Sequence, residues 1–157
     1  MTRRIISLLY LCAICVGLSV STSAQTTPIN WRMNVKMTSD TEGEVIIKAI
    51  VEPGWHLYGT ELPKGPGPKP TVIDMSQSNG VIFTTELSSA PATVEKTDAM
   101  FNRVLNWWDT NVTFRRRFKL TESKDASRSV KAVITFMGCN DATCLPPTTK
   151  ILTKTIK

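Results

Sequence analysis

Cys139 and Cys144 are the residues of this chain whose type and spacing could do chemistry. They occur in the stretch Gly-Cys-Asn-Asp-Ala-Thr-Cys-Leu-Pro-Pro, with four residues between them. Residues 129–137 and 148–156 are each predicted to form a strand, so the cysteines come where a hairpin closes. Opposed residues of an antiparallel pair have Cα atoms about 4.5 to 5.5 Å apart, which overlaps the range of about 4.4 to 6.8 Å for a disulfide. We therefore interpret the stretch as a redox site.

The short spacing favours a disulfide that reacts over one that only holds the fold together. An ordinary structural bridge is the competing interpretation for a small exported domain. In the chain-entropy model, a closed loop of about six residues contributes about 2 kcal/mol, against about 4.7 for a loop of about 100 residues. A tight bridge at a loop also tends to be easier to reduce. Pro146 and Pro147 cannot donate to a sheet ladder, so the chain after Cys144 should lie at an edge that a partner can approach.

The charges around the pair predict an acceptor of electrons, not an attacking thiol. No Lys, Arg or His lies between Val133 and Thr149, and Asp141 lies inside the loop. Local charge therefore gives no reason for a lowered thiol pKa. We expect a partner with its own activated thiol to open the bridge, after which this domain passes the reducing equivalents on.

Residues 1–24 are predicted to be a secretory signal peptide, with a basic start, an apolar run over 5–20 and a small polar end. The apolar run is shorter than the about 20 residues that cross a membrane; a retained membrane anchor is the alternative. Cys12 and Cys15 lie inside this segment and are expected to be removed with it. We expect a periplasmic protein without a lipid anchor.

The mature chain, residues 25–157, has the length of one domain and no further apolar stretch, so we expect no membrane span in it. The net charge of the whole chain is +6, a mild excess that falls when the basic start is removed. Residues 115–117 are three consecutive arginines in a strand-like pattern, where alternate side chains point to opposite faces. Without stacking aromatics beside them, they predict a solvated sheet face, and we expect no nucleic-acid partner.

Residues of alternating hydrophobicity are the main fold signal, and they predict an all-β chain. The pattern recurs over 31–38, 44–51, 111–120 and 129–137, with turn-rich intervals between. One residue departs from it, since Arg116 falls on the apolar side of its strand. Recurring strands of this kind predict an antiparallel β-sandwich of two sheets. The interval 59–70 is rich in proline and glycine and should be an extended surface loop or sheet edge.

Two further clusters bear on the site. Trp55, His56 and Tyr58 form a dense aromatic group that includes the only histidine of the chain, which is more often a packed residue than a ligand. Met100 and Phe101 lie in what should be a turn. Their side chains either fold back into the core or form a flap over an oxidisable group.

The cysteine stretch, with the earlier Pro-Gly-Trp-His-Leu-Tyr of residues 53–58, resembles the amino-terminal periplasmic domain of the thiol:disulfide interchange protein DsbD. The resemblance spans most of the mature chain, residues 25–157. It implies an immunoglobulin-like β-sandwich that relays electrons through the Cys139/Cys144 pair, with the activity of a thiol-disulfide oxidoreductase and no cofactor or metal. Cys144 would form the mixed disulfides and Cys139 would resolve them.

The resemblance also implies a cap loop over the pair, formed here by Asp98, Met100 and Phe101. Family members commonly carry an acidic pair at the start of the cap, whereas here Ala99 follows Asp98. Trp55, His56, Tyr58 and Pro146 are the expected supporting residues. The implied partners are a thioredoxin-like electron donor and a periplasmic disulfide isomerase or cytochrome-maturation thiol protein. Because the sequence ends at Lys157, we expect the donor to be a separate chain.

Two other classes of function remain open at this stage. The first is an immunoglobulin-like extracellular binding module with a structural disulfide, whose contact surface would be formed by Trp55, Tyr58, Trp107 and Trp108. The second is a copper carrier that uses His56, the cysteines and Met100 or Met137, because soft sulfur ligands and imidazole suit that metal. No metal-ligand spacing supports the second class.

Overall fold

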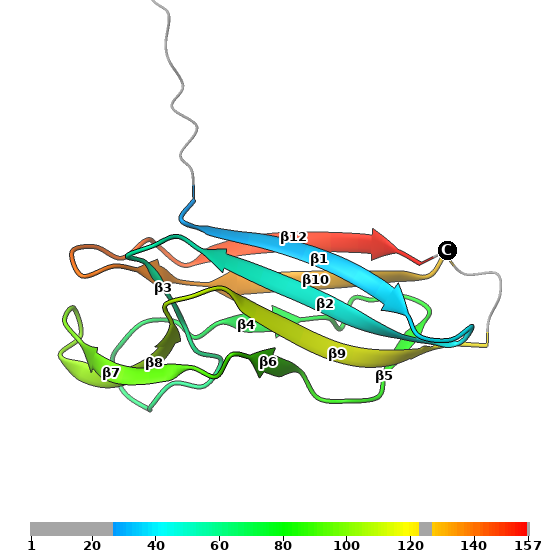
Figure 1. The fold of residues 1–157 in the computed structure, drawn as a ribbon, viewed down its shortest axis with the longest axis horizontal. Coiled ribbons are helices and arrows are strands. Elements are labelled where there is room, and N and C mark those ends of the chain that lie inside the picture. The colour runs from blue at the N-terminus through cyan, green and yellow to red at the C-terminus, as the bar shows by residue number, and fades with distance from the viewer. Residues whose placement is uncertain (1–26, 123–126, 157) are drawn as a thin grey trace, which may run out of the picture.

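The computed structural model describes residues 27–122 and 127–156, and all regular elements among them are strands (Figure 1). The fold is an immunoglobulin-like antiparallel β-sandwich, as the sequence predicted. Within the described ranges, no helix is long and apolar enough to cross a membrane. The expected signal peptide, residues 1–24, lies outside the described residues, so its boundary at residue 24 stays a prediction.

The first sheet has the strand order β1-β2-β9-β5, with β6 also paired to β9, and all its pairs are antiparallel. The long strands β1, β2 and β9 are those expected from alternating hydrophobicity. The bounds are β1 Ile29–Met37, β2 Glu42–Val51, β9 Val112–Leu120, β5 Val81–Phe83 and β6 Ser88–Ala90.

The second sheet, of order β12-β10-β4, lies against the first and closes the main core. Its strands are β12 Thr148–Thr155, β10 Ser129–Phe136 and β4 Val72–Asp74. Trp31 of β1 joins the two layers, since its ring stacks on Phe114 of β9 at 5.9 Å between centroids and tilts against Phe136 of β10 at 5.3 Å. The sandwich therefore has its own apolar interior, away from the cysteines.

A third sheet, of four short strands, has the order β11-β3-β8-β7 and carries the cysteine pair at one edge. Its strands are β11 Gly138–Cys139, β3 His56–Tyr58, β8 Arg103–Trp108 and β7 Val94–Asp98. Figure 1 shows the β7–β8 hairpin and the turn between β11 and β12 at the same end of the molecule. A second apolar cluster, with Tyr58, Leu105, Trp107 and Cys139 at its centre, fills this end.

Arg116, which broke the apolar pattern of its strand, is accommodated without entering the core. Its guanidinium lies over the ring of Phe83 at 4.5 Å, and its Nε donates a hydrogen bond to the Thr85 carbonyl at 2.8 Å. The edge strand β5 and the residues after it therefore cover this part of β9. The loop over 59–70 contains no strand, as expected, and Arg103 of β8 donates to the carbonyls of Pro66 and Lys64 in it.

Candidate functional site

Cys139 and Cys144 are joined by a disulfide, and their backbones form an isolated antiparallel bridge. The Cα atoms are 4.1 Å apart, slightly closer than the range expected from the sequence. The expectation that the two cysteines face each other across a tight bend is confirmed. Residues 140–143, which we call the cysteine loop, close the ring between them.

Asn140 shapes the cysteine loop through its side chain and its backbone. Its Oδ1 accepts hydrogen bonds from the Ala142 and Thr143 amides at 2.9 and 2.8 Å, and its own amide donates to the Thr143 carbonyl at 2.9 Å. Asn and Asp favour such turns because the short side chain can bond to the backbone two residues on. This role of Asn140 was not identified from the sequence, although Asn-Asp directly after a strand end is its signal.

Gly138 lets β11 lie close to the main sandwich. A Cβ at this position would come within 2.6 Å of Ile29 Cδ1, which is closer than carbon atoms approach. The backbone of β11 pairs with β3, so that Gly138 is opposite Leu57 and Cys139 is opposite His56. This pairing places the buried cysteine beside the aromatic group of β3.

The two cysteines differ in their access to solvent. Cys139 is fully buried, at 0% exposure, and packs in the second apolar cluster. Cys144 is half-buried and lies at the margin of the same cluster. A thiol that approaches from solvent therefore has a route to Cys144 and none to Cys139.

An aromatic layer lies beside the pair. The imidazole of His56 stacks on the Trp107 ring at 4.5 Å between centroids and meets the edge of Tyr58 at 5.0 Å. Tyr58 and Trp107 are direct partners in the β3–β8 pair. Because Tyr58, Trp107 and Trp108 are buried, the interpretation of the aromatics as one contact surface is wrong, and only Trp55 among them is partly exposed.

Asp98, at the end of β7, holds both the aromatic layer and the turn that follows it. Its Oδ2 accepts a hydrogen bond from the Tyr58 hydroxyl at 2.6 Å, and its Oδ1 accepts from the amides of Met100 and Phe101 at 2.9 and 3.0 Å. The carboxylate is only 2% exposed. Buried carboxylates are found where hydrogen bonds replace water, and here three donors do so.

The turn over residues 98–102, which we call the cap, places its two large apolar side chains differently. Phe101 folds back and packs against the second apolar cluster. Its ring meets the Tyr58 ring edge-on at 6.4 Å between centroids. Met100 is 50% exposed at the outer side of the turn. Asn102 has a positive φ of 50°, which lets the chain reverse into β8. Of the two sequence alternatives, packing into the core applies to Phe101, and Met100 stays outside it.

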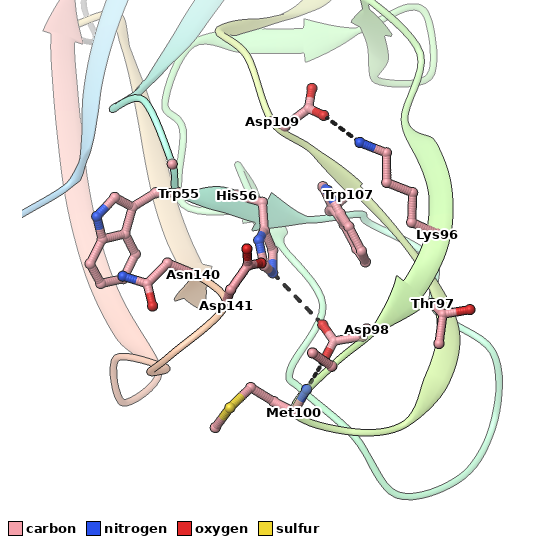
Figure 2. A pocket seen from close by; sticks show the side chains of 12 residues that line it. Trp55, His56, Lys96, Thr97, Asp98, Met100, Trp107, Asp109, Asn140 and Asp141 are labelled. Carbon is pink, nitrogen blue, oxygen red and sulfur yellow. Dashed lines mark hydrogen bonds and ion pairs between the residues drawn. The ribbon is translucent and has the colours of Figure 1, made fainter.

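A cavity of about 300 Å³ lies between the cap and the cysteine loop. Figure 2 shows Trp55, Asn140 and Asp141 on one side of it and Asp98 and Met100 on another. The imidazole of His56 and the Trp107 ring also line it. The cap and the cysteine loop, which are far apart in sequence, thus share one depression.

Burial shifts the proton affinity of two groups in the aromatic layer. It lowers the pKa of His56 from its usual 6.5, and Asp98, whose Oδ2 is 3.8 Å from His56 Nε2, only partly offsets this. Burial also raises the pKa of Tyr58 well above its usual range, and its hydrogen bond to Asp98 raises it further. At neutral pH the imidazole is therefore uncharged and the phenol keeps its proton.

Pro146 is exposed and lies between Cys144 and β12, outside any strand. Strand β12 is the edge of its sheet. This agrees with the expectation that the chain after Cys144 runs along an edge. Among residues 27–122 and 127–156, no group of three His, Cys, Asp or Glu side chains is arranged to hold a metal ion.

Comparison with known proteins gives a family match over nearly the whole chain. The model described as "Thiol:disulfide interchange protein DsbD, N-terminal" matches residues 24–156. No curated protein sequence matches. Among solved structures, the N-terminal periplasmic domain of ScsB from Proteus mirabilis is similar in fold, with a TM-score of 0.58 and 18% identity. That match covers 84% of this chain and 48% of the other, so this chain spans about half of its length.

The N-terminal domain of Neisseria meningitidis DsbD, in the reduced form, has a TM-score of 0.49 and 15% identity, over 83% of this chain and 91% of that one. The matched family model includes the strands of the sandwich, the cap and both cysteines. The chain therefore belongs to the family of DsbD N-terminal domains, which act in thiol:disulfide interchange.

Proposed function

We propose that this protein is a periplasmic thiol-disulfide exchange module that relays reducing equivalents through the Cys139–Cys144 disulfide. The observation that carries the proposal is the asymmetry of the pair, with Cys139 at 0% exposure and Cys144 half-buried at the margin of the second apolar cluster. A bridge that served only the fold would have no need of one partly exposed cysteine. Family membership supports the same chemistry.

The exchange consists of two displacements at sulfur. A partner thiolate attacks Cys144 Sγ, a new disulfide forms between partner and Cys144, and the electron pair of the broken bond leaves with Cys139 Sγ. A second thiol of the partner then attacks the partner's sulfur in this mixed disulfide, and Cys144 leaves with the electron pair. The partner leaves as a disulfide, and this domain holds two thiols. The reverse sequence reduces a client disulfide and restores the bridge.

We infer that the donor is a thioredoxin-like domain and that the clients are periplasmic thiol proteins such as a disulfide isomerase or a cytochrome-maturation protein. The partner must approach from the side of the cap, because the cavity opens between the cap and the cysteine loop. The exposed Met100 and the half-buried Trp55 provide apolar contacts there. The acidic Asp141 adds the one charge of the cysteine loop.

Covalent trapping tests the proposal. In the Cys139→Ser variant, Cys144 can form a mixed disulfide that no neighbouring thiol resolves, so exported partners should accumulate as adducts that disappear on reduction. The matched control is Cys144→Ser, whose single thiol is the buried one and should trap none. Equal trapping by both variants, or by neither, would contradict the proposal.

A further inference from the structure

Three residues of the third sheet and its margin lie in one row across neighbouring chain segments. Cys139 is opposite His56 in the β3–β11 pair and opposite Cys144 in the isolated bridge. Directly opposed residues of antiparallel strands point to the same face, with Cβ atoms about 4.5 to 5.5 Å apart. The side chains of His56 and Cys144 therefore flank Cys139 on the same face of the sheet.

The imidazole is held in place without a hydrogen bond to Nε2. The His56 side chain is 10% exposed, and Nε2 is fully buried with no hydrogen-bond partner in the described part of the chain. Its nearest carboxylate oxygen, Asp98 Oδ2, is 3.8 Å away (Figure 2). This oxygen already accepts a hydrogen bond from the Tyr58 hydroxyl. A buried polar atom left in this state in a native protein calls for a reason outside packing.

We propose that His56 is the general base that removes the proton from the Cys139 thiol when Cys139 resolves a mixed disulfide on Cys144. This proposal rests on the proposed function and adds a residue to it. Asp98 favours the tautomer with the proton on Nε2, which leaves the lone pair on Nδ1 to accept a proton. A thiol with a general base beside it is a common arrangement for activating the thiol as a nucleophile.

His56 Nδ1 takes the proton of Cys139, and the resulting thiolate attacks Cys144 Sγ. The bond between Cys144 and the partner breaks, and the partner leaves as a thiolate with the electron pair. The Cys139–Cys144 disulfide is restored, and the imidazolium then gives its proton to the solvent through the cavity.

The charges that face His56 fit a base that gains a proton only during turnover. Burial is the largest effect on the pKa of His56 and lowers it, so the imidazole is neutral at rest. Three carboxylates, those of Asp98, Asp109 and Asp141, favour the imidazolium once it forms, and Lys96 opposes them. Tyr58, the remaining titratable neighbour, keeps its proton. Cys139 thus has a nearby proton acceptor, although no cationic residue lies in its own loop.

A two-phase reaction isolates the resolving step. Reduced protein, freed of reductant, is mixed with dithiobis(nitrobenzoate). Attack by Cys144 releases one coloured nitrothiobenzoate, and attack by Cys139 on the mixed disulfide releases the second. The variant His56→Phe keeps a ring to stack on Trp107 but has no base. At neutral pH we expect its second phase to be about 100-fold slower, because general bases contribute about 10²- to 10⁴-fold.

The pH profile separates proton transfer from a structural effect. The second phase of the wild-type protein should fall as acid protonates His56, with a midpoint below 6.5. In His56→Phe, the rate should instead follow the ionisation of Cys139 alone, in the range of a buried thiol above about 8.5. The matched control, Val130→Ala in the main core, should lower stability but leave the profile unchanged.

Each result has a distinct meaning. A second phase of unchanged rate and profile in a folded His56→Phe overturns the role of His56 while leaving the exchange function intact. A wild-type protein that never shows a second phase contradicts the exchange function itself. As an independent readout, the imidazole signal of this only histidine should titrate at a different midpoint in the reduced and oxidised protein, since coupled groups share their titrations. Identical midpoints would count against the proposal.

Discussion

At the residue scale, the site depends on Asp98, which connects groups that sequence patterns treat separately. Its two oxygens hold the Tyr58 hydroxyl on one side and the amides of Met100 and Phe101 on the other. Asp98 therefore couples the position of the cap to that of the aromatic layer. The resemblance implied Asp98 as a cap residue, but its bond to Tyr58 follows only from the pairing of β3 and β7 with the two sides of β8.

Tyr58→Phe should destabilise the protein by about 1.5 to 3 kcal/mol, because it removes a hydrogen bond to a charged group at a buried position. Burial and Asp98 raise the pKa of Tyr58 in the folded protein, so folding retains a proton that the unfolded chain loses near pH 10. This contribution to stability is complete below about pH 10 and is lost as the pH rises further.

Denaturant unfolding at neutral pH and at pH values above about 10 measures this difference. The wild-type protein should lose more stability than Tyr58→Phe over the alkaline interval. A parallel decline in the two proteins would show that the Tyr58–Asp98 bond does not persist in solution.

At the scale of elements, the cap is the end of the β7–β8 hairpin, and its residue Phe101 covers part of the second apolar cluster. Phe101 packs on the second apolar cluster, whereas Met100 is 50% exposed and lines the cavity. The sequence predicted a turn with two large apolar side chains but left open which of them would be inside. The Asp98 side chain decides this, because its bonds to two consecutive amides fix the direction of the turn.

Phe101→Ala should increase the rate at which dithiothreitol reduces the disulfide, by about tenfold or more, because the second apolar cluster that holds the disulfide loses a packing partner. Met100→Ala is the matched control on the same turn and should change this rate by less than about twofold. The rates of reduction are measured by tryptophan fluorescence or by alkylation of the free thiols at timed intervals. Equal effects of the two substitutions would show that the cap does not shield the pair.

The long strands β1, β2, β9 and β10 could be predicted from their alternating residues, since one side of each strand faces the core. The short strands β3, β4, β5, β6, β7 and β11 could not, because two to five residues do not establish a period. The position of His56 beside Cys139 was hidden for the same reason. It depends on the pairing of β3 with β11, and no local pattern encodes that contact.

At the scale of the whole molecule, the sandwich and the redox end have separate apolar interiors. The main core joins the first and second sheets, and the second cluster fills the end that carries the disulfide. Electron exchange at that end therefore need not disturb the sandwich. The separation also explains why the sequence supported a sandwich and a reactive pair by independent arguments.

Replacing both cysteines by alanine should leave a folded sandwich that is about 2 kcal/mol less stable, because the bridge closes a ring of only about six residues. Urea unfolding of the oxidised wild-type and double-variant proteins measures the difference. A double variant that no longer folds would mean that the bridge is structural, and it would remove the main argument for exchange.

The potential of the Cys139–Cys144 couple tests the central claim most directly. The protein is equilibrated in dithiothreitol or glutathione buffers of graded ratio, quenched with acid, and its free thiols are then alkylated and counted by mass. A relay that accepts and passes on electrons should have a midpoint above about −300 mV, where partner dithiols can reduce it and clients can reoxidise it. A midpoint far below about −300 mV would identify a structural disulfide and contradict the account.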